Sequence, residues 1–264
     1  MGDINFNIEY NRKMKLIDSL KSEIAILVEK REYLIKDKKP FLESKYMMTI
    51  GKHEKERLEI EIEVRALKRE LSIRRAALNR GEKVTSEEIK EVLKKELRLW
   101  QNKINEYANQ IKKSELFLKL PRMDVEETKE FKSLYKKLVK RLHPDLNEFN
   151  EKSKFLWLRT CAAYKDGDLD ELRTLICIVQ NEEEDENYLE KNLLLIDDKI
   201  NELQQIFHNI NNQIEELHST FPFTIEKEIS SIIWIKNKVD EILENVNMLK
   251  NNREKLQVVL SEFL

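Results

Sequence analysis

Apolar side chains recur at alternating steps of three and four through the first third of the chain, the spacing that places them on one face of a helix. This pattern predicts a helix over about residues 8–38, interrupted at Pro40. It predicts a second helix over about 41–80 that ends before Gly81, because glycine can adopt the left-handed conformation that closes a helix. The two predicted seams consist of Ile17, Leu20, Ile24, Leu27 and Leu34, and of Ile60, Val64, Leu67, Leu71 and Leu78.

A third predicted helix has a well-marked start. Thr85 or Ser86 can accept hydrogen bonds from the first free backbone amides, and Glu88 follows Thr85 by three residues, which is the arrangement of a capping box. The helix is expected to continue to about Leu118. Its apolar face consists of Leu93, Leu97, Trp100, Ile104, Tyr107 and Ile111.

The C-terminal third carries two runs of apolar residues with a strict heptad spacing, over residues 193–217 and 232–260. A sustained period of 3.5 residues keeps one apolar seam facing a partner helix, as in a coiled coil. The link at 218–223 contains Pro222 and is short. The two runs are therefore predicted to fold back on each other as an antiparallel hairpin.

Composition favours an all-α fold. Charged residues make up 37% of the 264 residues, whereas only 4 Gly and 4 Pro are present, so the chain has few of the residues that strands and turns require. We expect long helices that form coiled-coil arms, with a small helical module between them. The expected division is an N-terminal arm over 1–115, the module over 116–180 and the C-terminal coiled-coil hairpin over 181–264.

Charge and hydropathy narrow the expected environment. The 48 basic and 50 acidic residues give a net charge of −2, which provides no overall attraction to nucleic acid or to an anionic membrane. No apolar run approaches the roughly 20 residues of a membrane span, and residues 1–10 lack the layout of a signal peptide. The protein is expected to be cytoplasmic, with no membrane or nucleic-acid partner. Cys161 and Cys177 are expected to be buried free thiols.

The central module begins with an amphipathic helix. Asp124 is expected to cap it and is followed by an acidic first turn, which suits the positive end of the helix dipole. Apolar residues form an inward stripe, and basic residues recur on another face. The stripe consists of Phe131, Leu134, Leu138 and Leu142, and the basic face of Lys132, Lys136 and Lys140, with Lys137 and Arg141 alongside.

The tripeptide His143-Pro144-Asp145 follows this helix directly. Proline lacks an amide donor and disfavours helical conformation in the preceding residue, so the helix is predicted to end at His143 in a stiff polar loop. A second helix is expected from near Lys152 to Gly167, and a short third helix after a cap at Asp168. The expected apolar face of the second helix consists of Phe155, Trp157, Leu158, Cys161 and Tyr164.

Residues from about 116 to 178 resemble a J domain, the module of DnaJ-type co-chaperones. The resemblance rests on Tyr135-Lys136-Lys137-Leu138, the interval from Tyr135 to the His143-Pro144-Asp145 loop, Asn147, and the spacing from Trp157 to Ala163-Tyr164. It implies a helical hairpin that engages a DnaK-type ATPase chaperone at its nucleotide-binding domain and interdomain linker and stimulates ATP hydrolysis there. The implied partner-binding residues are His143, Pro144 and Asp145 as the essential triplet, and Tyr135, Lys132, Lys136, Lys137, Lys140 and Asn147 as the docking face.

A second interpretation fits the same residues. A lysine stripe is commonly only the solvated side of an amphipathic helix. In most J domains the first helix carries a pair of tyrosines, and Leu116-Phe117-Leu118-Lys119-Leu120 stands in their place. The alternative is a structural coiled-coil adaptor or oligomer in which a degenerate module is a spacer. In either case the arms are expected to serve targeting or oligomerisation, with a second copy of the chain or an unidentified cargo protein as partner.

Other chemistries find little support in the sequence. The four glycines are too scattered for a phosphate-binding loop. Glu215 and His218 have the Glu-x-x-His spacing of helical di-iron sites, but the second copy that such sites need is missing. No catalytic residue, cofactor or metal site is predicted, and the protein is expected not to be an enzyme.

Overall fold

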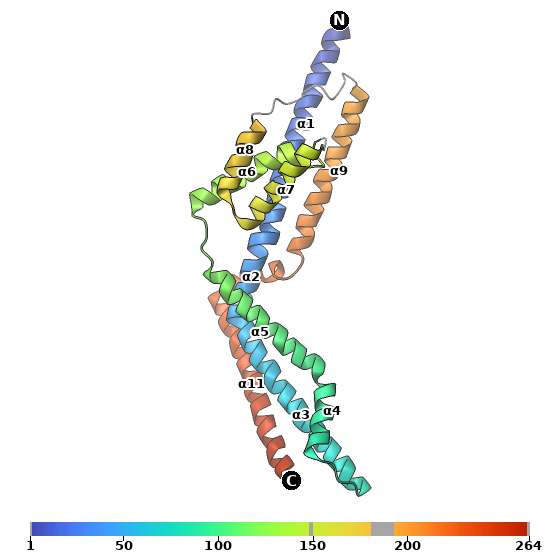
Figure 1. Cartoon of the computed structure of the whole chain (residues 1–264), viewed down its shortest axis with the longest axis vertical. Coiled ribbons are helices and arrows are strands. Elements are labelled where there is room, and N and C mark those ends of the chain that lie inside the picture. The colour runs from blue at the N-terminus through green and yellow to red at the C-terminus, as the bar shows by residue number, and fades with distance from the viewer. Residues whose placement is uncertain (1, 148–149, 181–192, 263–264) are drawn as a thin grey trace. The chain divides into compact units, whose positions relative to one another are not determined.

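The structure, a computed structural model, describes residues 2–147, 150–180 and 193–262 (Figure 1). Every regular element within these ranges is a helix and none is a strand, so the predicted all-α fold class is confirmed. The first residues of the predicted C-terminal hairpin, 181–192, lie outside the described ranges.

The helices form two units, and each unit combines N-terminal with C-terminal segments of the chain. Unit 1 consists of residues 1–39 and 121–224, and unit 2 of residues 40–120 and 225–264. These units cut across the division expected at residues 115 and 180. The two C-terminal heptad runs belong to different units, each with a helix from the N-terminal part of the chain.

Unit 1 is built on the first helix. Its elements are α1 (Gly2–Tyr33), the π-helical turn η1 (Leu34–Lys38), α6 (Val125–Leu142), α7 (Glu151–Asp166), α8 (Leu169–Gln180) and α9 (Leu193–His218). The α1 seam at Ile17, Leu20 and Ile24 is buried, and α9 lies along this helix (Figure 1). The apolar faces of α1 and α9 are removed from water because each helix covers the other.

Unit 2 is built on α3 (Lys52–Arg80), which has α11 (Ile232–Ser261) on one side and α5 (Arg98–Lys119) on another (Figure 1). The further elements are α2 (Lys39–Tyr46), η2 (Met47–Gly51), α4 (Ser86–Glu96) and α10 (Glu226–Ser230), and η3 (Phe223–Ile225) crosses the boundary of the units in the sequence. Buried residues of η2, α3 and α11 form one cluster: Ile50, Ile60, Val64, Ile242 and Val246. On the α5 side, the Glu54 carboxylate accepts hydrogen bonds from the hydroxyls of Tyr46 and Tyr107, at 3.0 and 3.2 Å.

The predicted antiparallel hairpin between the two heptad runs is wrong. In unit 1, Lys13 Nζ lies 2.7 Å from Asp197 and Arg31 donates to Gln213 at 2.8 Å, so α1 and α9 run parallel. In unit 2, the pairs Lys250–Glu56 and Arg253–Glu63 likewise make α11 parallel to α3. A heptad pattern specifies that a seam must be covered, but not which helix covers it.

Four local predictions can be compared with the structure. Gly81 has a φ of 70°, and Thr85 forms the expected capping box with Glu88, so both signals are confirmed. The expected single helix from 86 to 118 is wrong, because Leu97 leaves helical geometry (φ −93°, ψ 2°) and separates α4 from α5. Leu78 is 68% exposed and does not belong to the α3 seam as predicted.

The predicted interruption at Pro40 takes the form of a wider helical turn. The Lys39 amide donates to the Leu34 carbonyl, a π-type hydrogen bond, and α2 continues from Lys39 through Pro40. Proline removes one backbone donor, so a widened turn immediately before it replaces the regular hydrogen-bond pattern without ending the helical backbone.

Candidate functional site

The site is an antiparallel pair of helices, α6 and α7, joined by the His143-Pro144-Asp145 loop. Asp124 and Glu127 form a complete capping box at the start of α6, as the acidic start of this helix favours. The predicted inward stripe is confirmed, since Phe131, Leu134, Leu138 and Leu142 are all buried. At the other end of α6, His143 is extended (φ −64°, ψ 129°), as proline after it requires.

The buried face of α7 differs from the predicted one. Gly167 has a φ of 71° and ends the helix as expected. Phe155 and Leu158, however, are 59% and 60% exposed, so their assignment to the apolar face is wrong. Tyr164 is buried as predicted, and the other buried positions, Leu156, Thr160 and Ala163, lie one residue away from predicted ones.

His143 organises the loop rather than projecting from it. Its Nδ1 accepts a hydrogen bond from the Asp145 amide at 3.2 Å, and its ring meets Trp157 edge-on with centroids 4.9 Å apart. Accepting this bond requires an unprotonated Nδ1, so the neutral ring carries its proton on Nε2. Burial lowers the pKa of His143 below its ordinary value, and Asp145 offsets this only in part. Pro144 and Asp145 are exposed at the tip of the loop.

Asn147 closes the end of α6. Its Nδ2 donates at 2.9 Å to the carbonyl oxygen of Lys140, which lacks its usual helical partner because Pro144, four residues on, has no amide hydrogen. It also donates at 3.4 Å to the His143 carbonyl oxygen, which accepts the Leu146 and Asn147 amides as well. Its Oδ1 accepts a hydrogen bond of 3.0 Å from Lys21 Nζ on α1. Asn147 therefore fixes the loop on α6 and also joins it to the first helix.

The predicted basic face of α6 is divided. Lys132 Nζ lies 3.4 Å from the ring centroid of Tyr33 and 3.8 Å from Glu29 Oε1, both on α1. Lys140 Nζ lies 2.6 Å from the Asp18 carboxylate, also on α1. Lys136 is half-buried near Glu29, and Lys137 is exposed. Arg141 turns elsewhere and donates to the Val179 carbonyl of α8 at 3.0 Å.

Tyr135 is not on a docking face, so this part of the implied site is corrected. Its side chain is 1% exposed, and its ring lies 3.9 Å, centroid to centroid, from that of Tyr164. Burial raises the pKa of the Tyr135 hydroxyl above its ordinary value. The residue is four positions after Phe131 and therefore lies on the buried stripe of α6.

Sequence reasoning missed the residues of α1 that meet this site. Glu29 is 8% exposed, and within the described residues its Oε1 has no hydrogen-bond partner. Burial raises the pKa of Glu29 above its ordinary value, and the charges of Lys132 and Lys136 offset only part of this effect. The available signal was a polar stripe at helical spacing beside the α1 seam, namely Asp18, Lys21, Glu29, Tyr33 and Lys36.

Comparison with known proteins finds no similar protein at a significant level. No family model matches this chain, and neither the curated proteins nor the solved structures contain a significant match.

Other parts of the described chain offer no competing centre. No cluster of three or more His, Cys, Asp or Glu suited to a metal ion is found in the described ranges. None of the helices within them has the length and apolar character needed to cross a membrane. Both cysteines are free thiols, but Cys177 is exposed, so the prediction that it is buried is wrong.

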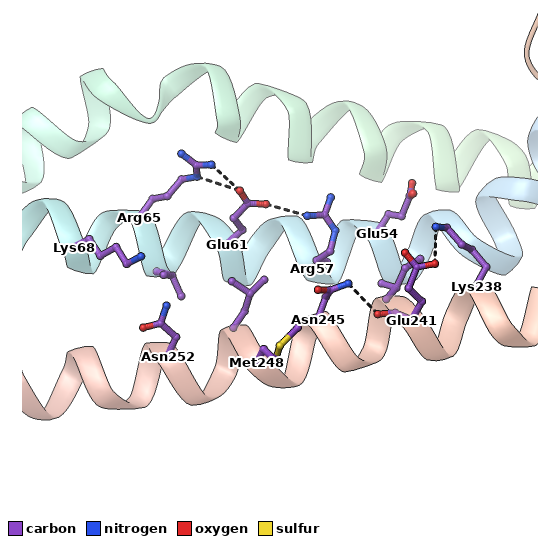
Figure 2. Close-up of a pocket in the computed structure, with 13 residues that line it drawn as sticks. Glu54, Arg57, Glu61, Arg65, Lys68, Lys238, Glu241, Asn245, Met248 and Asn252 are labelled. Atoms are coloured by element: carbon purple, nitrogen blue, oxygen red, sulfur yellow. Dashed lines mark hydrogen bonds and ion pairs between the residues drawn. The ribbon is translucent and has the colours of Figure 1, made fainter.

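Unit 2 contains a groove of about 760 Å³ along α3 and α11 (Figure 2). Figure 2 shows Arg57 and Arg65 paired with Glu61 on α3, and Lys238 paired with Glu241 on α11. These are pairs within single helices, of the kind that stabilises exposed helix surfaces. The groove therefore favours no particular class of ligand.

Proposed function

We propose that this protein is a J-domain-type co-chaperone that acts in the cytoplasm on a DnaK-type ATPase chaperone. The observation that supports this function best is the His143-Pro144-Asp145 loop at the end of the basic helix α6. His143 fixes the loop through the Asp145 amide, and Pro144 and Asp145 are exposed at its tip. A preformed loop loses little conformational freedom when a partner binds it.

Charge supports the same proposal. Lys132, Lys136, Lys137 and Lys140 lie on the helix that leads into the loop, and Asp145 adds one negative charge at its tip. A basic surface of this size is suited to steering an acidic partner surface into one orientation, and it affects association rate more than affinity. Binding is expected to weaken as salt concentration rises.

In this proposal the chain performs no chemistry of its own. Its residues bind and orient the partner, and the partner hydrolyses ATP. Asn147 and His143 hold the loop against α6, so that Pro144 and Asp145 meet the partner in a fixed geometry. Helices α9 and α11 are left for targeting, for a cargo protein or for a second copy of the chain.

The test is the steady-state ATPase rate of a DnaK-type chaperone titrated with the full chain. Wild type is expected to stimulate hydrolysis, and His143→Gln and Asp145→Asn to abolish stimulation. Asp145 is suited to this because its side chain is 56% exposed, so its substitution should leave the fold intact. His208→Gln is the matched control, since His208 is an exposed histidine on α9. Lack of stimulation over a wide concentration range, both by wild type and by a variant that releases Lys132 and Lys140 from α1, would reject the proposal.

A second candidate function is a structural helical adaptor in which the α6–α7 hairpin is a spacer. One observation favours it: Lys132 and Lys140 already have partners on α1. An adaptor would leave ATPase activity unchanged with wild type and His143→Gln alike. Sedimentation or light scattering would then be expected to show self-association.

A further inference from the structure

The first helix, α1, contacts other helices of unit 1 through two faces. One is the apolar seam that meets α9. The other, which we call the cover face, lies on the α6–α7 hairpin and consists of Asp18, Lys21, Glu29 and Tyr33, with Lys36 of the adjoining η1 turn. The contacts run along the hairpin: Asp18 and Lys21 meet Lys140 and Asn147, and Glu29 and Tyr33 meet Lys132. Further on, Lys36 Nζ lies 5.2 Å from the ring centroid of Tyr164.

These contacts involve side chains that, in the proposed function, bind the partner. Lys140 Nζ lies 2.6 Å from Asp18, and Lys132 Nζ lies 3.4 Å from the centre of the Tyr33 ring. The amide oxygen of Asn147 is occupied by Lys21 at 3.0 Å. An acidic group of a partner that approached Lys132 or Lys140 from this side would meet α1 first.

Three residues of the site stay open. Pro144, Asp145 and Lys137 are exposed. The loop tip is therefore accessible for a first contact, whereas the basic face beside it is only partly accessible, with the side chains of Lys132 and Lys140 30% and 33% exposed.

We propose that α1 is an intramolecular cover, which competes with the acidic surface of the DnaK-type partner for Lys132, Lys140 and Asn147 and which leaves the hairpin when that partner binds. The inference rests on the proposed co-chaperone function. A site that is open only for a fraction of the time binds with an apparent affinity reduced by that fraction. Apart from that of the buried Glu29, the cover contacts are polar and partly exposed, and contacts of this kind are individually weak. A partner that first docks on the loop tip is therefore able to displace them.

Variants of α1 alone test the cover, because the proposed function places no partner contact on this helix. Asp18→Lys puts a like charge beside Lys140, and Tyr33→Leu removes the ring below Lys132 while keeping an apolar side chain. The Asp18 side chain is 70% exposed, so its replacement should leave unit 1 folded. Glu23→Lys is the matched control: it makes the same charge change on α1 at an exposed position whose carboxylate meets Ser19 of the same helix.

The measured quantity is the concentration of the full chain that gives half-maximal stimulation of the DnaK-type ATPase. The Asp18→Lys/Tyr33→Leu variant is expected to lower it about two- to tenfold relative to wild type. Glu23→Lys is expected to leave it unchanged. His143→Gln is expected to abolish stimulation in every background. Stimulation by the cover variant with none by wild type would support the cover most strongly.

Two outcomes separate the cover from the function on which it rests. If wild type stimulates in a His143-dependent manner and the cover variant matches it, the cover is rejected and the co-chaperone function stands. If neither wild type nor the cover variant stimulates, both are rejected.

Hydrogen exchange on the wild-type protein provides a test without any substitution. Addition of the DnaK-type chaperone is expected to protect α6 and to increase exchange over residues 18–36, in α1 and η1. Protection of α6 with unchanged or slower exchange in α1 would overturn the cover.

Discussion

The ring of Tyr135 lies 3.9 Å from the ring of Tyr164, measured between centroids, and links α6 to α7. Phe131, also on α6, stacks on Tyr164, and the two ring centroids are 5.0 Å apart. Aromatic pairs contribute about 0.5–1.5 kcal/mol beyond the burial of their area. Tyr135 is therefore a packing residue of the hairpin.

Tyr135→Ala is expected to destabilise unit 1 by about 3–5 kcal/mol, because it removes a buried ring. Tyr135→Phe keeps the ring and its volume, and its effect is expected to stay below about 1.5 kcal/mol. Urea unfolding followed by circular dichroism measures both. If Tyr135→Phe kept wild-type stability but no longer stimulated the DnaK-type ATPase, the hydroxyl would have a role in binding that its burial argues against.

The position of Tyr135 was available from the sequence. Spacing alone put Phe131, Leu134, Leu138 and Leu142 on the buried stripe, and Tyr135 follows Phe131 by one helical turn. The likeness to a J domain assigned it instead to a docking face. Here the elementary spacing rule was the better guide.

The pairing of long helices was not available in the same way. The heptads over 193–217 and 232–260 correctly marked buried positions such as Ile196, Leu203 and Val246. The heptad pattern did not identify the partner helix, because any apolar seam of similar period can cover these positions. The contacts that the pairing brings together join residues far apart in sequence, such as Arg253 and Glu63.

The pairing of α11 with α3 predicts a sharp contrast within one helix. Ile242 is 4% exposed in the cluster with Ile60 and Val64, whereas Met248 is 62% exposed. Ile242→Ala is expected to destabilise unit 2 by about 2–5 kcal/mol. Met248→Ala is expected to change stability by less than about 0.5 kcal/mol. Denaturant unfolding measures the difference, and hydrogen exchange should show the loss of protection in α3 as well as α11. Equal effects of the two substitutions would contradict this pairing.

Glu29 makes the stability of unit 1 depend on pH in a defined direction. Burial raises its pKa above the ordinary value of 4.5, so the folded state holds the proton more tightly than the unfolded chain. The contribution of protonated Glu29 to stability is fully present below pH 4.5 and is lost as pH rises from 4.5 through the raised pKa. Above that range the wild-type protein carries a buried charge.

Glu29→Gln is neutral at every pH and is therefore expected to be more stable than wild type at pH 7, by on the order of 1 kcal/mol. The advantage should disappear near pH 4. Thermal unfolding at both pH values measures it, with Glu23→Gln as the exposed control on the same helix. A less stable Glu29→Gln at pH 7 would show that attraction to Lys132 and Lys136 exceeds the effect of burial.

The end of α6 shows where sequence reasoning succeeded and where it stopped. Proline after His143 predicted the extended residue and the loop, and both are present. The contacts of Lys132 and Lys140 with α1 were not predicted. They join residues about a hundred or more positions apart, and the sequence of a basic stripe is the same whether the stripe faces solvent or another helix.

The structural role of His143 requires the neutral ring and therefore depends on pH. Burial holds its pKa below the ordinary value of 6.5, so the unfolded chain takes up the proton at a higher pH than the folded state does. Its contribution to stability is fully present above pH 6.5 and is lost as pH falls through 6.5 toward the lowered pKa. Protonation of Nδ1 also removes the acceptor for the Asp145 amide, which holds the loop in place.

An NMR titration of the His143 ring is expected to give a midpoint below 6.5. As pH is lowered from 7.5 to 5.5, the stability of wild type relative to His143→Gln should fall. The stability of wild type relative to His208→Gln is the control for effects unrelated to the loop. A His143 midpoint at or above 6.5 would contradict the buried, neutral ring. Because the same proton breaks the bond to Asp145, stimulation of the DnaK-type ATPase should decline over the same pH range in which this stability is lost.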